Sequence, residues 1–152
     1  MNVRIVDFPE TLVAVIEHRG PPHLEHESVR KMVAWRIANR MPPDRHRSYG
    51  LHFNDPRTAG NDYRVDMCVS VDHPIVENAD GVMNKIIPAG RCALARYIGS
   101  RENVTASAYL YETWLPASGE RMRDYPIIFH YVNVGPNIPE HEMITDVYLP
   151  IV

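Results

Sequence analysis

The fold of this chain is decided by a stretch that occurs twice, first as Ala14-Val15-Ile16-Glu17-His18-Arg19-Gly20 and then, 79 residues later, as Ala93-Leu94-Ala95-Arg96-Tyr97-Ile98-Gly99. Each copy opens with apolar residues typical of a buried strand, and a glycine ends it. Further landmarks repeat in the same order at offsets of 78 to 80 residues: Trp35 and Trp114, His52-Phe53 and His130-Tyr131, Asp66 and Asp146. We interpret this as a duplication, the alternative being coincidence; two copies of one unit are expected to pack about a pseudo-two-fold axis with a ligand cleft at the seam.

The composition is that of a globular protein. The 152 residues are 45% hydrophobic and 23% charged, and a net charge of −3 argues against direct binding to nucleic acid. No apolar run is long enough for a membrane span, and no signal peptide is evident, so we expect a cytoplasmic protein without a membrane partner. Cys68 and Cys92 both lie in apolar stretches, which predicts buried, reduced thiols.

Outward from the first copy, we expect strands at 3–6 and 11–17, a helix at 25–40, and strands at 48–53 and 63–71. Val29, Met32, Val33 and Ile37 have the spacing of a core-facing helix stripe, with Trp35 to one side. In the second copy we expect strands at 83–87, 91–98, 127–134 and 144–151 and a helix at 103–115 that Pro116 stops. The predicted fold is α+β: one domain, 1–152, built from a tandem β-α-β-β duplication (repeat one 1–75, linker 72–81, repeat two 82–152) with helices packed on an antiparallel sheet.

The second half carries a recognisable pattern. The helix ends in Trp114-Leu115-Pro116-Ala117-Ser118-Gly119, and the chain closes with Thr145-Asp146-Val147-Tyr148-Leu149-Pro150-Ile151. On these residues the chain resembles the GyrI-like, or bacterial transcription-activator effector-binding, domain family. The resemblance implies a tandem β-α-β-β fold with a hydrophobic ligand cleft. Its members act as effector domains of AraC- or MerR-type regulators, as free-standing proteins such as the DNA gyrase inhibitor, or as small hydrolases, and this chain is most similar to the free-standing class.

One position departs from the family pattern. Members typically have a glutamate on the pocket floor, in the strand after the Trp-Leu-Pro motif, and this chain has Phe129 there. A phenyl ring cannot accept a proton, and its cation–π attraction of about 0.5–2 kcal/mol is weaker than a buried ion pair. We therefore expect a preference for neutral aromatic ligands over cations and no hydrolysis of the family type.

The predicted ligand site is aromatic. Aromatic side chains can surround a ligand through their rings and orient it through their polar edges, although such a set can equally form core. The candidate ligand-binding residues are Phe129, Tyr131, Trp114, Tyr111 and Tyr148 in the second half, and Trp35, Tyr49 and Leu51 in the first.

Other chemistry-bearing residues have plainer interpretations. We expect His130 to be structural and to face away from Phe129, and we interpret Asp66 and Asp146 as structural acceptors. The pair His23 and His26 lacks a third metal ligand and suits a solvated helix start.

We predict no catalytic residue, cofactor or metal, and a small apolar or aromatic molecule as the partner. The alternatives are a modulator of DNA gyrase or another protein, and a hydrolase that uses Glu112 in place of the family acid; enzymatic activity is left open.

Overall fold

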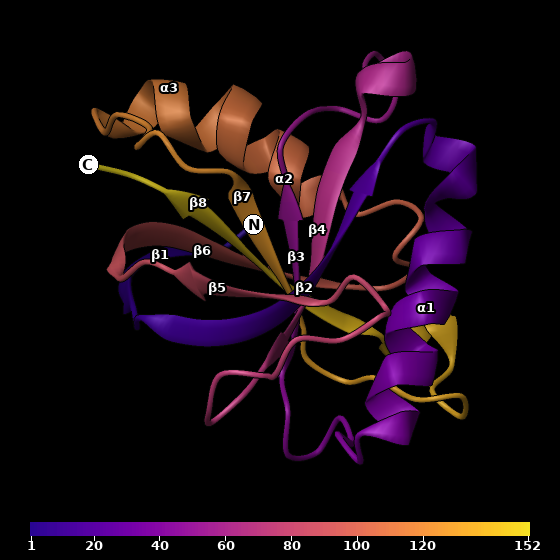
Figure 1. Cartoon of the computed structure of the whole chain (residues 1–152). Helices are drawn as coiled ribbons and strands as arrows, with labels where there is room; N and C mark the ends of the chain where they lie inside the picture. Colours follow the sequence, from indigo (N-terminus) through magenta and orange to yellow (C-terminus); the bar gives the residue numbers. More distant parts are fainter. The chain divides into compact units, whose positions relative to one another are not determined.

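The structure, a computed structural model, describes residues 1–152. The chain divides into two compact units: a contiguous one, Thr11–Ile87, and a discontinuous one, Met1–Glu10 with Pro88–Val152. The fold is α+β, as predicted; eight strands pair in antiparallel fashion, four in each unit (Figure 1). None of the helices has the length and apolar character that a membrane crossing requires.

The contiguous unit has the strand order β3-β4-β2-β5. Its strands are β2 (Thr11–Arg19), β3 (Ser48–His52), β4 (Arg64–Ser70) and β5 (Met83–Ile87), and its helix is α1 (Glu25–Ala38). Strand β2 lies between β4 and β5 and is buried on both faces along most of its length, as its apolar run predicts. Two 3₁₀ turns, Pro22–Leu24 and Gly60–Asp62, precede α1 and β4.

The discontinuous unit has the corresponding order β7-β8-β6-β1. Its strands are β1 (Val3–Phe8), β6 (Gly90–Ile98), β7 (Ile127–Tyr131) and β8 (Ile144–Pro150), with a 3₁₀ turn at Glu140–Glu142. Its helix comprises α2 (Thr105–Tyr109), a π-helical turn (Leu110–Trp114) and α3 (Leu115–Ser118).

The first strand of each sequence half belongs to the other compact unit. Strand β1 pairs with β6, and β5 pairs with β2, so the bounds of the units differ from those of the predicted repeats. Within the units the repeated landmarks take corresponding places. The amide of Gly20 donates to the Tyr63 carbonyl at 2.9 Å, and that of Gly99 donates to the Met143 carbonyl at 2.8 Å. Both glycines have positive φ (131° and 145°), which explains why glycine ends both copies. The duplication stays a prediction that these correspondences support.

Helix α1 buries a different face from the one expected. Met32 and Trp35 pack into the core, whereas the stripe Val29, Val33 and Ile37 is exposed, Ile37 by 75%. Polar contacts fix this rotation: His18 hydrogen-bonds Ser28 Oγ at 2.9 Å, and Arg36 Nη1 donates to Ser48 Oγ at 2.7 Å. The expectation of a core-facing valine–isoleucine stripe was therefore wrong, because spacing alone does not choose between two apolar stripes on one helix.

The second helix continues through Pro116, where the sequence predicted its end. The π-helical turn Leu110–Trp114 immediately precedes α3, which has Pro116 in its first turn. Inside a helix a proline removes one amide donor and its ring crowds a preceding carbonyl, and the wider π turn just before Pro116 is the kind of local widening that accommodates such a residue. Gly119, with φ of 77°, ends the helix.

Candidate functional site

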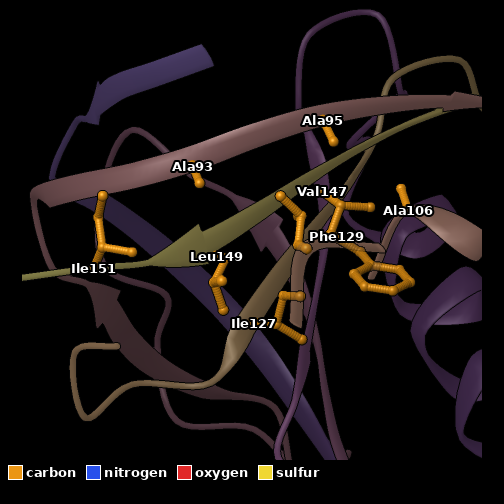
Figure 2. Packing of buried hydrophobic residues seen from close by; sticks show 9 residues of the cluster. Ala93, Ala95, Ala106, Ile127, Phe129, Val147, Leu149 and Ile151 are labelled. Atoms are coloured by element: carbon orange, nitrogen blue, oxygen red, sulfur yellow. The ribbon is translucent and has the colours of Figure 1, made fainter. Parts of the chain in front are cut away.

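The helix-covered face of the discontinuous unit is a small apolar core. The side chains of Ala93 and Ala95 on β6 are small and leave room for larger groups from β7, β8 and the helix. Figure 2 shows the Phe129 ring projecting from β7 toward the helix that carries Ala106. The buried cluster comprises Ala93, Ala95, Ala106, Leu110, Ile127, Phe129, Val147, Leu149 and Ile151.

Aromatic side chains lie at the border of this cluster. Tyr97, Trp114 and Tyr131 pack against it and stay partly exposed. Phe129 is only 9% exposed, and its ring meets that of Tyr131 edge-on, with centroids 6.3 Å apart and planes at 70°. The structure therefore brings together three predicted site residues, Phe129, Tyr131 and Trp114, on one face of one unit.

A fixed guanidinium completes this group. Arg101 lies over the Tyr131 ring, with its Cζ atom 5.2 Å from the ring centroid. Its Nη2 atom donates to the Asn133 carbonyl at 2.9 Å, to Asn133 Oδ1 at 3.2 Å and to the Ile144 carbonyl at 2.8 Å, and its Nε atom donates to Thr145 Oγ1 at 3.2 Å. Burial lowers the pKa of Arg101 from its usual value, and the nearby Tyr131 phenol opposes that shift.

The other two predicted residues of this unit lie elsewhere. Tyr148 is adjacent to Val147 on β8 and so points to the opposite face of the sheet, where its ring meets that of Phe8 at 5.1 Å and 83°. Tyr111 is 38% exposed on the π-helical turn. The five aromatics therefore do not share one face, because alternation along β8 separates Tyr148 from Phe129.

The face that carries Tyr148 also carries a charged pair. Arg96 donates to both carboxylate oxygens of Asp146, at 2.8 and 3.0 Å, and this hydrogen bonding raises the pKa of Arg96. His130 is the register partner of Asp146, whereas Phe129 pairs with Val147. His130 thus faces away from Phe129, and Asp146 is a structural acceptor, both as predicted.

The first-half candidates are also divided between two faces. Trp35 packs with Ala14 and Ile16 beneath α1, whereas Leu51 is the register partner of Asp66 on the opposite face, which Tyr49 shares. Burial raises the pKa of Tyr49.

The pairing register corrects one proposed equivalence between the halves by one residue. Leu51 opposite Asp66 corresponds to His130 opposite Asp146, and Gly50, opposite Met67, corresponds to Phe129. The match of His52 with His130 was therefore wrong, because the two hairpins differ by one residue in offset.

The same face of the contiguous unit holds a charged cluster that the sequence did not reveal. Lys85 Nζ donates to Glu17 Oε2 at 2.5 Å and to Asp66 Oδ2 at 2.8 Å. The hydrogen bond from Lys85 lowers the pKa of Glu17, and, although burial opposes it, the two carboxylates raise the pKa of Lys85. These residues lie on three strands, so their proximity depends on strand pairing. Asp66 is a structural acceptor, as predicted.

Groups capable of nucleophilic or acid–base chemistry are poorly placed. Cys68 and Cys92 are both free and buried, as predicted, and burial raises the pKa of each thiol. Glu112 is exposed on the helix that buries Ala106 and Leu110. His23 and His26 are exposed, and His26 Nδ1 hydrogen-bonds the His23 carbonyl at 2.9 Å. The Phe129 face therefore offers apolar contact and one fixed cation.

The sequence contained Arg101 without indicating its role. It lies in the polar stretch Ser100-Arg101-Glu102-Asn103, which resembles any solvated loop. Asn133, a position in the family pattern, is fixed by the Ile144 amide, which donates to Oδ1 at 2.7 Å, and by the Glu142 carbonyl, which accepts from Nδ2 at 2.8 Å. Its use as an Arg101 acceptor could be seen only in the folded chain.

Known proteins match the chain along its whole length. The GyrI-like small molecule binding domain family matches residues 1–152. "Probable transcriptional regulator YgiV" of Escherichia coli (strain K12) is 38% identical over 154 residues, covering 99% of this chain and 96% of the relative. A protein named DNA gyrase inhibitor, from Erwinia billingiae (strain Eb661), is 29% identical over 157 residues, covering 99% and 97%.

Solved structures share the fold at low identity. The EcmrR C-terminal domain has a TM-score of 0.78 at 14% identity, covering 99% of this chain and 97% of that one. SAV2435 bound to tetraphenylphosphonium has a TM-score of 0.64 at 8% identity, covering 100% and 94%. At these identities the likeness concerns the fold alone.

Proposed function

The chain belongs to the GyrI-like small molecule binding domain family, and we propose that it binds a small, largely apolar or aromatic ligand at the sheet face that carries Phe129 and Tyr131. The observation that supports this best is the border of the apolar cluster. Tyr97, Trp114 and Tyr131 rest on buried neighbours while part of each ring stays exposed. Rigid rings held in this way gain contact with a ligand at little cost in side-chain entropy.

The proposed ligand is not a cation. SAV2435 was solved with tetraphenylphosphonium, a lipophilic cation. In this chain the position of the family glutamate is the buried Phe129, and the guanidinium of Arg101 lies over the neighbouring Tyr131. A second positive charge would meet repulsion where the family pattern supplies a carboxylate. A neutral aromatic ligand avoids this cost.

The two tryptophans offer a direct test. Trp114 borders the proposed site, whereas Trp35 is buried in the other compact unit. A Trp35→Phe variant therefore reports from Trp114 alone, and Trp114→Phe is the matched control that reports from Trp35 alone. We expect neutral naphthalene derivatives to change the fluorescence of Trp35→Phe and to leave that of Trp114→Phe nearly unchanged. Equal changes in both variants, or none in either, would contradict the proposed site.

Thermal stability supplies an independent readout. A ligand at about 100 times its Kd stabilises the folded state by about 2.7 kcal/mol, which for a chain of this size raises Tm by about 5–10 °C. Neutral aromatics should produce such a shift at lower concentration than tetraphenylphosphonium does.

A protein partner is the second candidate. The exposed stripe Val29, Val33 and Ile37 on α1 favours it, because contiguous apolar side chains on a surface often mark protein contacts, and one relative is named a DNA gyrase inhibitor. Under this candidate DNA gyrase binds the wild type and not a Val33→Lys variant. Binding that survives Val33→Lys, or no binding to gyrase at all, would remove the candidate.

Location in the cytoplasm is part of the proposal. Both cysteines are free and buried, which suits a reducing compartment.

A further inference from the structure

The geometry around Arg101 points to a ligand class more specific than a neutral aromatic. We propose that the Phe129–Tyr131 face binds an aromatic carboxylate, with its ring against these two side chains and its carboxylate paired with the guanidinium of Arg101. This inference rests on the proposed function and deepens it.

Arg101 has no negatively charged group among its hydrogen-bond acceptors. Each of its four hydrogen bonds goes to a neutral oxygen: two backbone carbonyls, the Asn133 amide and the Thr145 hydroxyl. By contrast, Arg96 in the same unit is paired with both oxygens of the Asp146 carboxylate. Arg101 therefore holds its charge in a half-buried position through dipoles, and a carboxylate from a ligand would supply the missing countercharge.

Arg101 keeps one amino group with which it can donate to a ligand. Its bonds to the protein use Nε and Nη2, which leaves the Nη1 amino group for another acceptor. The remaining Nη1 group is part of a permanently charged guanidinium, so it can donate a charge-assisted hydrogen bond to one oxygen of a carboxylate.

The side chains that accept hydrogen bonds from Arg101 are themselves fixed. Thr145 is fully buried, and Asn133 is fixed by its own bonds to the Ile144 amide and the Glu142 carbonyl. The guanidinium is thus held in place before any ligand arrives, which reduces the entropy lost on binding.

The aromatic rings of Tyr131 and Phe129 lie beside the Arg101 guanidinium. Arg101 lies 5.2 Å from the Tyr131 centroid, and the Phe129 ring is 6.3 Å from that of Tyr131. Apolar surface and a fixed positive charge are therefore contiguous. A ligand with a ring and an attached carboxylate matches this sequence of groups, whereas a neutral ligand would use only the apolar part.

The experiment compares three ligands that share a naphthalene ring, by titration calorimetry at pH 7: 2-naphthoate, its planar neutral isostere 2-naphthamide, and the cationic 2-naphthyltrimethylammonium. We expect the wild type to bind the naphthoate about tenfold tighter than the amide, and the cation weakest. The preference should shrink as salt rises from about 50 to 500 mM, because salt screens charge pairs.

Variants separate recognition from structural support. Arg101→Gln should abolish the preference for naphthoate, so that the variant binds naphthoate and naphthamide with affinities within about twofold of each other. Arg101→Lys should retain part of the preference, because it keeps the charge and loses the bonds that fix the guanidinium to Asn133, Ile144 and Thr145. A residue that only supports the fold would change all three affinities together. If Arg101→Gln does not fold, Arg101→Lys and the salt dependence of the wild type decide.

The outcomes distinguish the two proposals. Tight binding of naphthamide without any preference for naphthoate, or a preference that survives Arg101→Gln, overturns this inference and leaves the proposed function standing. Binding of none of the three ligands overturns both.

Discussion

Replacing His52 with glutamine should flatten the dependence of stability on pH in mildly acidic solution. His52 ends β3, and burial lowers its pKa from 6.5 to about 4. Burial favours the neutral imidazole, because a charged group loses hydration inside the protein. In the unfolded chain His52 therefore becomes protonated below pH 6.5, whereas in the folded chain it becomes protonated only near pH 4.

The magnitude follows from that gap. One pKa unit corresponds to about 1.4 kcal/mol, so the free energy of unfolding loses about 3 kcal/mol once the pH is below both values and about 2 kcal/mol between pH 7 and pH 5. These are upper figures, because His52 keeps some exposed surface. Above pH 6.5 the contribution to stability is complete, and it is lost as the pH falls toward 4.

Urea denaturation followed by circular dichroism at pH 7 and pH 5 measures this loss. The wild type contains seven other histidines, so the informative quantity is the difference between wild type and His52→Gln in the stability lost over that interval. The control is His26→Gln at an exposed position, which should lose as much stability as the wild type. If His52→Gln also loses as much as the wild type, burial of a neutral imidazole is not the cause of the acid sensitivity.

Three further substitutions test the candidate site, the charged cluster around Lys85 and the apolar core of the discontinuous unit. Phe129→Glu should create affinity for tetraphenylphosphonium, measured by titration calorimetry. The proposed site is wrong if the wild type already binds this cation in the micromolar range, about −8 kcal/mol, and the variant binds it no better. Lys85→Met should lower the free energy of unfolding by about 2 kcal/mol, less than for a fully buried pair because Lys85 is 29% exposed. The control Lys85→Arg should retain most of the stability, and equal urea midpoints for Lys85→Met and wild type would contradict this prediction. Leu110→Ala should cost about 2–5 kcal/mol in urea denaturation, since Leu110 is fully buried, and a loss below 1 kcal/mol would mean that the helix is not packed as described.

The sequence predicted the strands well, because their apolar runs and glycine ends are local signals. Each expected strand exists, and the bounds differ by at most three residues. It predicted helix rotation poorly: the stripe Val29, Val33 and Ile37 is as regular as the buried one, and the polar contacts that α1 makes through Glu25, Ser28 and Arg36 are not visible in the spacing.

The candidate site was predictable in part. The family pattern and the aromatic spacing both indicated Phe129, Tyr131 and Trp114, and the structure places these three residues together on one face; their contact with a ligand stays a prediction. Tyr148 lies on the opposite face, which the list of aromatic residues could not reveal because it did not take account of alternation along β8. Arg101 was missed because its partners, Asn133, Ile144 and Thr145, are more than 30 residues away in sequence.

The exchange of first strands has a consequence for the order in which the chain can fold during synthesis. The contiguous unit is complete once Ile87 has left the ribosome, whereas β1 has to wait until β6, with the partner of Val3 at Ala95, has been made. Until then an unpaired strand edge belongs to the nascent chain, and such edges invite pairing with other chains. Moving residues 1–10 behind Val152 by circular permutation would make both units contiguous, and would let β6 emerge before the strand that pairs with it.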